Sequence, residues 1–336
     1  MSSLRTYILG RLLLTLPMVW VLVTVVFLIL RVMPGDPCLA ILRESATQAQ
    51  LDNCRRGLGI DRPLLVQYSS YLFGLVQGDL GTSMTRRRAV SLEILDRFPA
   101  TLELSLAAML VTAGVGISTG AFAAQHRKSP WDYVLRIWSI VIYSMPIFWF
   151  GLILQLIFGL RLGLLPTYGR VGVELAPRAI TGFYIVDSIL TLNWPSLLSS
   201  VKHLILPAMT LGLVLSGIFT RLTRANMLDV LKQDFITAGR ARGIGESSLV
   251  YGHALKNAFI PILTLMGLQF ALLMAGAILT ETTFSWPGMG RLLVERIYDR
   301  DFATVQGVVT LFAVMVAVIS LLVDIAYAYI DPRIRY

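Results

Sequence analysis

The chain has 336 residues, of which 56% are hydrophobic and only 15% are charged. Because soluble domains carry roughly 25% charged residues on average, much of this chain is expected to lie in lipid. The formal net charge of +9 does not indicate a nucleic-acid binder. Such a protein gathers its basic residues on one face of a soluble body, whereas these arginines flank apolar stretches.

Six stretches lack Asp, Glu, Lys, Arg and His and approach the roughly 20 residues that a helix needs to cross a hydrocarbon layer of about 30 Å. They are residues 12–30, 104–124, 137–160, 204–220, 257–280 and 302–323. Helices are favoured because a span in lipid must satisfy its own backbone hydrogen bonds, and a barrel would show short alternating segments instead. The sequence therefore predicts an all-α, polytopic membrane protein with six transmembrane helices.

The first span is expected to be retained, because the motif PGDP at residues 34–37 follows it in place of a signal-peptide cleavage site. Lys and Arg in short connections mark the cytoplasmic side. They occur in both terminal tails and in the second and fourth connections, so both termini are predicted to be cytoplasmic. The predicted parts are residues 1–33 (tail and first span), 34–99 (a periplasmic segment), 100–330 (a core with the other five spans) and 331–336 (a cytoplasmic tail).

The periplasmic segment has two recognisable features. Apolar residues recur every three or four positions over residues 64–76, which predicts an amphipathic helix along the outer membrane surface, and a second short helix is predicted over residues 90–98. Cys38 and Cys54 both lie in this segment, on the side where disulfides persist. We expect a bond between them that staples the outer end of the first span; two free thiols are the alternative.

The chain lacks the constellation of residues that an enzyme needs. Its three histidines, His126, His203 and His253, fall in separate segments without metal-ligand spacing. None of its four lysines follows a glycine, so a Gly-Lys-Ser/Thr phosphate loop cannot be built. No metal or cofactor is therefore expected in this chain, and any ATP hydrolysis must come from another one.

The longest inner connection is polar, basic and carries small residues in a recognisable order. Thr237, Ala238 and Gly239 are small, Gly243 follows four positions after Gly239, and His253 lies ten residues farther on. Small residues followed by a glycine allow a short helix to approach another surface closely and then to turn sharply.

This segment resembles the EAA loop of ABC importer permeases, in which Glu-Ala-Ala, three residues, Gly, nine residues and Ile-x-Leu-Pro form a coupling helix. Thr237, Ala238 and Gly239 take the Glu-Ala-Ala positions, and Gly243 takes the glycine position. His253 and Leu255 take the Ile and Leu positions, and Lys256 replaces the proline. These departures resemble the variant found in the dipeptide, oligopeptide and nickel subgroup.

The rest of the chain resembles that subgroup almost end to end. The motifs are MPGDP (33–37), GDLGTSM (78–84), RFPATLELSLAAML (97–110), YSMPIFWFGL (143–152), LLPTYGR (164–170), HLILPAMTLGL (203–213), GAILTETTFSWPGMGRLL (276–293) and DPRIR (331–335). The resemblance implies the type I ABC importer permease fold and a coupling helix over about 237–248. The residues implied to contact an ATPase are Thr237, Ala238, Gly239, Arg240, Gly243, His253 and Leu255.

The same resemblance implies a set of partners in the bacterial inner membrane. They are a second permease subunit that completes a heterodimer, two cytoplasmic ATPase subunits that hold ATP and Mg, and a periplasmic substrate-binding protein. The implied cargo is a dipeptide or short oligopeptide, with a nickel chelate or glutathione as alternatives.

Three residues are candidates for the substrate path. Glu103 and Glu281 sit at outer ends of predicted spans, where a carboxylate can meet a peptide amino group or simply be hydrated at the interface. Pro146 lies within the third span, where a proline kinks a helix. A secondary transporter and a membrane enzyme are the two alternative classes of protein. A secondary transporter would carry charges at mid-membrane and inverted repeats, and a membrane enzyme would carry a catalytic constellation. None of the six spans contains a central charge.

Overall fold

The computed structural model describes residues 4–32, 37–42, 46–275 and 277–330. Apart from one isolated bridge between Thr82 and Ala89, the regular secondary structure of these residues is helical. The all-α prediction is therefore confirmed for the part of the chain that is described. The motif at residues 331–335, the predicted tail at residues 331–336 and most of the motif at residues 33–37 lie outside it.

The helices follow one another as α1 Leu4–Val32, α2 Pro37–Leu42, α3 Gln48–Leu58, α4 Leu64–Val76, α5 Val90–Gln125, α6 Pro130–Ser144, α7 Ile147–Leu154, the π-helix η1 Gln155–Arg161, α8 Tyr184–Leu190, α9 Trp194–Val230, α10 Asp234–Ala241, the π-helix η2 Ser248–Ala254, α11 Leu255–Met274, α12 Ile278–Thr283, α13 Met289–Tyr298 and α14 Phe302–Ile330. Five spans are long and apolar enough to cross a bilayer, in α1, α5, α9, η2 with α11, and α14. A sixth is formed if α6 and the α7–η1 helix are counted together.

The predicted third span, residues 137–160, is broken rather than merely kinked. Helix α6 ends at Ser144, Met145 is extended, and Pro146 begins α7. The two parts meet at a bend of 103°. A proline disfavours the helical conformation of the residue before it and offers no N–H for the helix ladder, which explains the break.

Other predicted boundaries also differ. Helix α9 extends ten residues beyond the predicted end at Thr220, to Val230, so Arg221 and Arg224 lie on a helix rather than in a loop. The predicted fifth span ends at Met274, and its last residues belong to the separate helix α12. The short helix predicted over 90–98 is continuous with the second span in α5. In each case a run of uncharged residues marked the apolar part but not the point where the helix stops.

Helices α5 and α9 pack against each other without room for side chains at three glycines. A Cβ at Gly116 would lie 2.5 Å from the Cβ of Phe219, and a Cβ at Gly120 would lie 2.6 Å from that of Thr223. Gly212 of α9 similarly faces Val111 of α5. The sequence GISTG at 116–120 is a small-xxx-small pattern, which lets two membrane helices approach closely.

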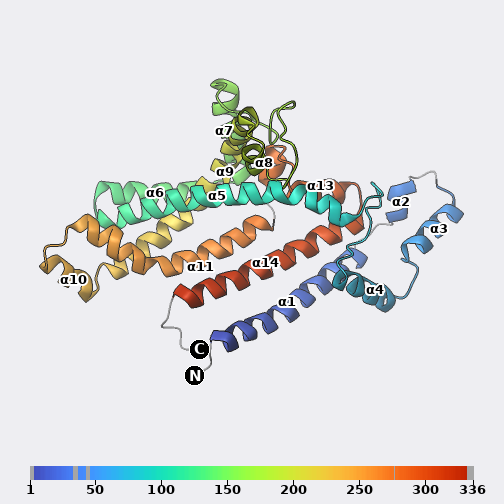
Figure 1. The fold of residues 1–336 in the computed structure, drawn as a ribbon, viewed down its shortest axis with the longest axis horizontal. Coiled ribbons are helices and arrows are strands. Elements are labelled where there is room, and N and C mark those ends of the chain that lie inside the picture. Colours follow the sequence, from blue (N-terminus) through green and yellow to red (C-terminus); the bar gives the residue numbers. More distant parts are fainter. Residues whose placement is uncertain (1–3, 33–36, 43–45, 276, 331–336) are drawn as a thin grey trace.

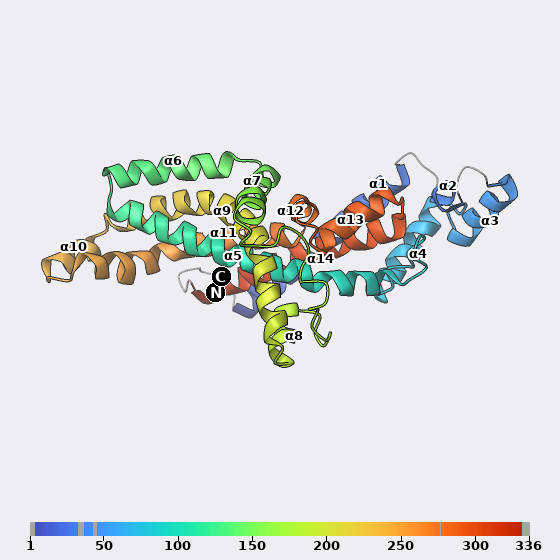
Figure 2. The ribbon, with the colours of Figure 1, turned by 90° about the horizontal axis from the view of Figure 1, so that it is seen from above.

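Most of the long helices run roughly along the long axis of the molecule (Figure 1). The connection from α5 to α6, helix α10, the start of α1 and the end of α14 lie toward one end, while α2, α3 and α4 lie toward the other. Helices α7 and α8 project sideways on opposite sides of α5 (Figure 2). We call the end with α10 the coupling end and the end with α2–α4 the outer end.

At the outer end, α4 is fastened to two spans. The helix predicted over 64–76 is confirmed as α4. Its Tyr68 hydroxyl lies 2.6 Å from the Thr24 hydroxyl of α1, and its Tyr71 hydroxyl lies 2.6 Å from the Thr310 hydroxyl of α14. Cys38 and Cys54 form a disulfide with a Cα separation of 5.9 Å, which joins α2 to α3.

The close α5–α9 contact predicts opposite effects of two alanine substitutions on the same helix. Gly116→Ala should destabilise the protein by about 1–3 kcal/mol, because the added methyl group has no room beside Phe219. Gly114→Ala, where no heavy atom lies within 4 Å of the added methyl, should be neutral or stabilise the helix by up to about 1 kcal/mol. Thermal unfolding of the purified protein in detergent measures both. Equal stability of the two variants would show that the helices do not meet at Gly116.

Candidate functional site

The coupling end carries the segment in which the sequence places the EAA-like residues. Helix α10 ends at Ala241, and Gly243 adopts a φ of +78°. The Gly243 N–H donates to the Arg240 carbonyl at 3.0 Å, and the Ile244 N–H donates to the Gly239 carbonyl at 3.2 Å. This is a Schellman motif, in which glycine takes the left-handed position after the helix. Within the range 237–248, where a coupling helix is expected, the structure has the end of the helix Asp234–Ala241, a sharp turn and the start of η2.

One face of α10 is buried against the ends of the spans. Ile236 is fully buried in a cluster that includes Met227 of α9, Val250 of η2 and Ala121 of α5. Gly239 is also buried, and a Cβ there would lie 2.6 Å from a methyl group of Leu249. The small residue at 239 therefore allows α10 to rest directly on η2, which continues into α11.

The opposite face of α10 is open. Thr237, Ala238 and Arg240 are exposed, and so is His253 on η2, while Leu255 is half-buried. Arg240 and Glu246 form a bidentate ion pair across the turn, with contacts of 2.6 and 3.0 Å. The hydrogen bond from Arg240 lowers the pKa of Glu246, so the pair is ionised at neutral pH. Of the EAA-like residues of α10, Thr237 and Ala238 are therefore exposed, whereas Gly239 lies against η2.

A buried polar contact holds the coupling end of α6 to α9. The Ser129 hydroxyl caps α6 by accepting from the Asp132 N–H, and the Asp132 carboxylate receives two hydrogen bonds from Arg224, at 2.6 and 2.8 Å. Arg221 donates to the Ser139 carbonyl at 2.9 Å. The two arginines predicted to lie in an inner loop thus secure one helix to another.

At the outer end, the two candidate carboxylates have partners within the protein. Glu103 is buried and receives hydrogen bonds from Arg170 at 2.6 and 3.0 Å and from the Ile185 N–H at 3.0 Å. The Arg170 guanidinium also lies over the Tyr184 ring, 3.8 Å from its centroid. In this conformation Glu103 fastens the segment before α8 to α5 and offers no oxygen to a substrate.

Glu281 is fully buried between α12, α13 and α5. It receives hydrogen bonds from the Thr101 hydroxyl at 2.7 Å and the Arg291 N–H at 2.9 Å. Any Cβ at Gly288 would overlap its carboxylate. Burial raises the pKa of Glu281 to about 7, against the opposing effect of these hydrogen bonds. Pro146 is exposed at the start of α7, and no contact joins it to either carboxylate.

Several of these partners were not singled out from the sequence. Arg170 lies 67 residues from Glu103, and Thr101 lies 180 residues from Glu281, so no local spacing links them. The only signal was a charged residue at the edge of an apolar run, which in lipid demands a partner.

The chain matches a known protein family along nearly its whole length. Residues 116–336 match the family described as binding-protein-dependent transport system inner membrane component, and residues 4–106 match its N-terminal companion. The chain belongs to this family. It is therefore a multi-pass inner-membrane component of a transport system, which sets it apart from the secondary transporters and membrane enzymes considered above.

Relatives that are 38–42% identical to the chain cover nearly its whole length. It is 42% identical over 332 residues to a di/tripeptide transport system permease protein DppB of Pseudomonas aeruginosa, across 98% of this chain and 99% of the relative. It is 39% identical over 334 residues to a dipeptide transport system permease protein DppB of Escherichia coli, across 98% of each chain. A glutathione transport system permease protein GsiC of Salmonella typhi is 38% identical over 330 residues.

The buried Glu103–Arg170 pair predicts a strong asymmetry between single and double substitutions. Arg170→Ala should destabilise this permease by about 3–5 kcal/mol, because Glu103 is left buried without a counter-charge. The double variant Glu103→Gln with Arg170→Leu should recover much of that loss, since it buries no charge. Thermal unfolding in detergent measures both. A double variant as unstable as Arg170→Ala would show that the lost charge pairing is not the cause.

Proposed function

We propose that this permease is the subunit of an ATP-driven, binding-protein-dependent importer that carries dipeptides or short oligopeptides. The observation that carries the proposal is near full-length identity of 39–42% to permeases named for di- and tripeptide or dipeptide transport. A glutathione importer is the second candidate, favoured by the GsiC relatives at 38%. ATP and Mg are held by two partner ATPase subunits, and a second permease completes the conduit.

The contacts of α10 at the coupling end support a mechanism for ATP-driven transport. The exposed face of α10 is the surface that docks on an ATPase subunit, with both chain termini on the same, cytoplasmic side. Its buried face touches α9, η2 and α5, so a displacement of α10 acts on three spans at once. Closure of the ATPases then shifts the permease between two global states, provided that nucleotide favours one of them.

Uptake measurements test the substrate. A strain that lacks this permease should lose uptake of labelled dipeptides and tripeptides and regain it when the gene is restored. Loss of glutathione uptake with peptide uptake intact would favour the second candidate. Uptake that persists without any binding protein would contradict the proposed function.

The positive φ of Gly243 predicts that coupling fails when this residue is replaced. A β-branched residue fits the left-handed region poorly, at a cost on the order of 1–3 kcal/mol, so Gly243→Val should distort the end of α10. Since the turn lies outside the spans, the variant should reach the membrane at near-normal levels. We expect at least about tenfold lower uptake and weaker co-purification of the ATPase subunits.

The matched control is Gly245→Val. Gly245 also has open space around it but lacks a positive φ, so this variant should transport normally. A second probe of the same face is Ala238→Asp, which introduces a charge into the proposed contact and should also weaken co-purification. Full transport by Gly243→Val and Ala238→Asp, with ATPases bound, would place the coupling surface elsewhere.

A further inference from the structure

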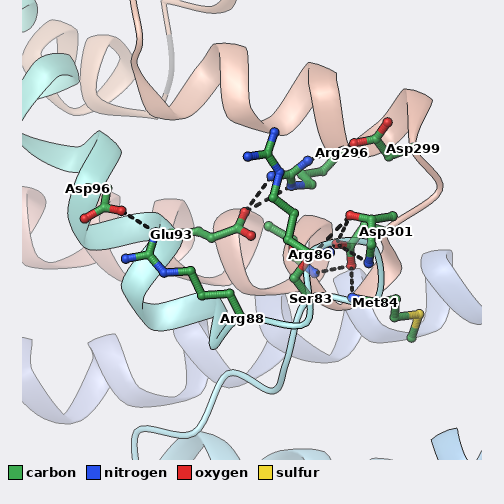
Figure 3. A network of polar contacts seen from close by, with 11 residues as sticks. Ser83, Met84, Arg86, Arg88, Glu93, Asp96, Arg296, Asp299 and Asp301 are labelled. Atoms are coloured by element: carbon green, nitrogen blue, oxygen red, sulfur yellow. Dashed lines mark hydrogen bonds and ion pairs between the residues drawn. The ribbon is translucent and has the colours of Figure 1, made fainter.

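A polar pocket opens at the outer end, and the residues that line it take no part in the side-chain hydrogen bonds described above. Its volume is about 170 Å³, and it lies between residues 83–88, the first turns of α5, and α13. Its lining includes four arginines and two acids, namely Arg86, Arg88, Arg97, Arg296, Glu93 and Asp96. Figure 3 shows all of these except Arg97 with labels. An excess of positive charge on this side runs against the usual accumulation of Lys and Arg in cytoplasmic loops, so membrane topology does not explain it.

The floor of the pocket is rigid. Arg296 is almost fully buried and donates two hydrogen bonds to Glu93, at 2.9 and 3.0 Å, and one to Asp299 at 2.8 Å. The second oxygen of Glu93, Oε1, has no hydrogen-bond partner among the described residues. This pair fixes α13 against α5 and leaves the remaining arginines free to act at the surface.

The turn at residues 83–88, which carries Arg86 and Arg88, is held in place by Asp301. Asp301 is fully buried at the start of α14 and accepts hydrogen bonds from the Ser83 hydroxyl at 2.5 Å, the Thr85 hydroxyl at 3.0 Å and the Met84 N–H at 3.2 Å (Figure 3). Burial alone would raise the pKa of Asp301, but these donors outweigh it and hold the pKa below its ordinary value. The turn is therefore preorganised, which lowers the entropy lost on binding.

Three guanidinium groups remain available at the mouth. Arg86 and Arg97 form no side-chain hydrogen bond or ion pair with any residue that the structure describes. Arg88 contacts Asp96 at 2.6 Å, but both side chains are about half exposed, and such surface pairs contribute little. An incoming carboxylate can thus contact Arg86 and Arg97 and compete with Asp96 for Arg88.

The pocket lies on a different side of α5 from the exposed apolar residue Leu95. On α5, Glu93 and Arg97 share one side, because residues four apart in a helix are neighbours. The exposed apolar side chain of Leu95 lies roughly 160° around the helix from Glu93. The lipid-facing side of this helix and the pocket are therefore separate surfaces. At about 30 Å³ per water, the pocket has room for the end of one acidic side chain and a few waters.

We propose that this pocket is a docking point for an acidic side chain of the substrate-binding protein, with Arg86, Arg88 and Arg97 as its ligands. The proposal rests on the proposed function, which supplies a protein partner on the outer side. Complementary charge of this kind fixes the register of a complex and speeds association, and its contribution falls as salt rises.

The test compares a charge reversal with two controls. The double variant Arg86→Glu with Arg97→Glu is set against Arg86→Lys with Arg97→Lys, which keeps the charge, and against Arg178→Glu, an exposed arginine of the segment before α8. Each is purified with its partner subunits into nanodiscs of phosphatidylcholine alone. Binding of the substrate-binding protein that supports uptake in cells is measured at 50 and 300 mM KCl.

We expect the charge reversal to weaken binding at least about tenfold at 50 mM KCl and to differ much less from wild type at 300 mM. Arg178→Glu should match wild type, the lysine variant should lie between, and ATPase activity without binding protein should be unchanged. A single Asp→Lys or Glu→Lys change on the binding protein should restore affinity for the charge-reversal variant.

Three results would overturn the proposal. The first is a charge-reversal variant that binds with unchanged affinity. The second is that no Asp→Lys or Glu→Lys change on the binding protein restores the affinity. The third is an effect that appears only when phosphatidylglycerol is added, which would assign the arginines to a lipid headgroup. The proposed function fails separately, if wild-type uptake proceeds without a binding protein.

Discussion

The close approach of α5 and α9 is the contact on which the other parts depend. With 36 residues, α5 extends roughly 54 Å and reaches both ends of the molecule. At the coupling end its Ala121 and Ala124 take part in the cluster that receives α10. At the outer end it supplies Glu93, Thr101 and Glu103, each bonded to a different segment. The helix therefore links these three polar contacts of the outer end to the coupling end.

Helix α5 makes different kinds of contact toward its two ends. Toward the coupling end, small residues such as Gly116 and Gly120 bring α5 and α9 close together, and a hydrogen bond of 2.8 Å between the Thr119 and Thr220 hydroxyls adds to the packing. Toward the outer end, where α5 carries Glu93 and Glu103, buried ion pairs to Arg296 and Arg170 fix the partners. A buried pair adds little net stability but strongly disfavours any arrangement that separates its charges. The two ion pairs thereby hold the outer segments in one position relative to α5.

The sequence was informative where a property is local and failed where it depends on distant residues. Among the described residues, apolar length located the five continuous spans and the bent third one, and the 3.6-residue repeat located α4 at Leu64–Val76. The small residues around Gly239 marked a close approach, and the structure places Leu249 there. Helix ends were less predictable. Helix α9 continues past Thr220, where Arg221 and Arg224 find acceptors on α6 and Met227 and Val230 are buried, and none of these partners is visible in the local sequence. The partners of Glu103 and Glu281 come from other parts of the chain, so no spacing rule identifies them.

The distribution of helix breaks shows where the chain can change shape. Helices α5 and α9 are continuous, whereas the third span breaks at Pro146 and the fifth gives way to α12 after Met274. The segments beyond these breaks meet each other, since Phe284 packs against Leu154 and Leu206. A displacement of α10 would act on the continuous helices α5 and α9 and, through η2, directly on the fifth span. The breaks at Pro146 and after Met274 are the places where backbone torsions can absorb such a displacement. The carboxylate of Glu281, in α12, lies against Gly288 and accepts a hydrogen bond from Thr101 of α5. This hydrogen bond joins α12, which follows the break in the fifth span, to the continuous helix α5.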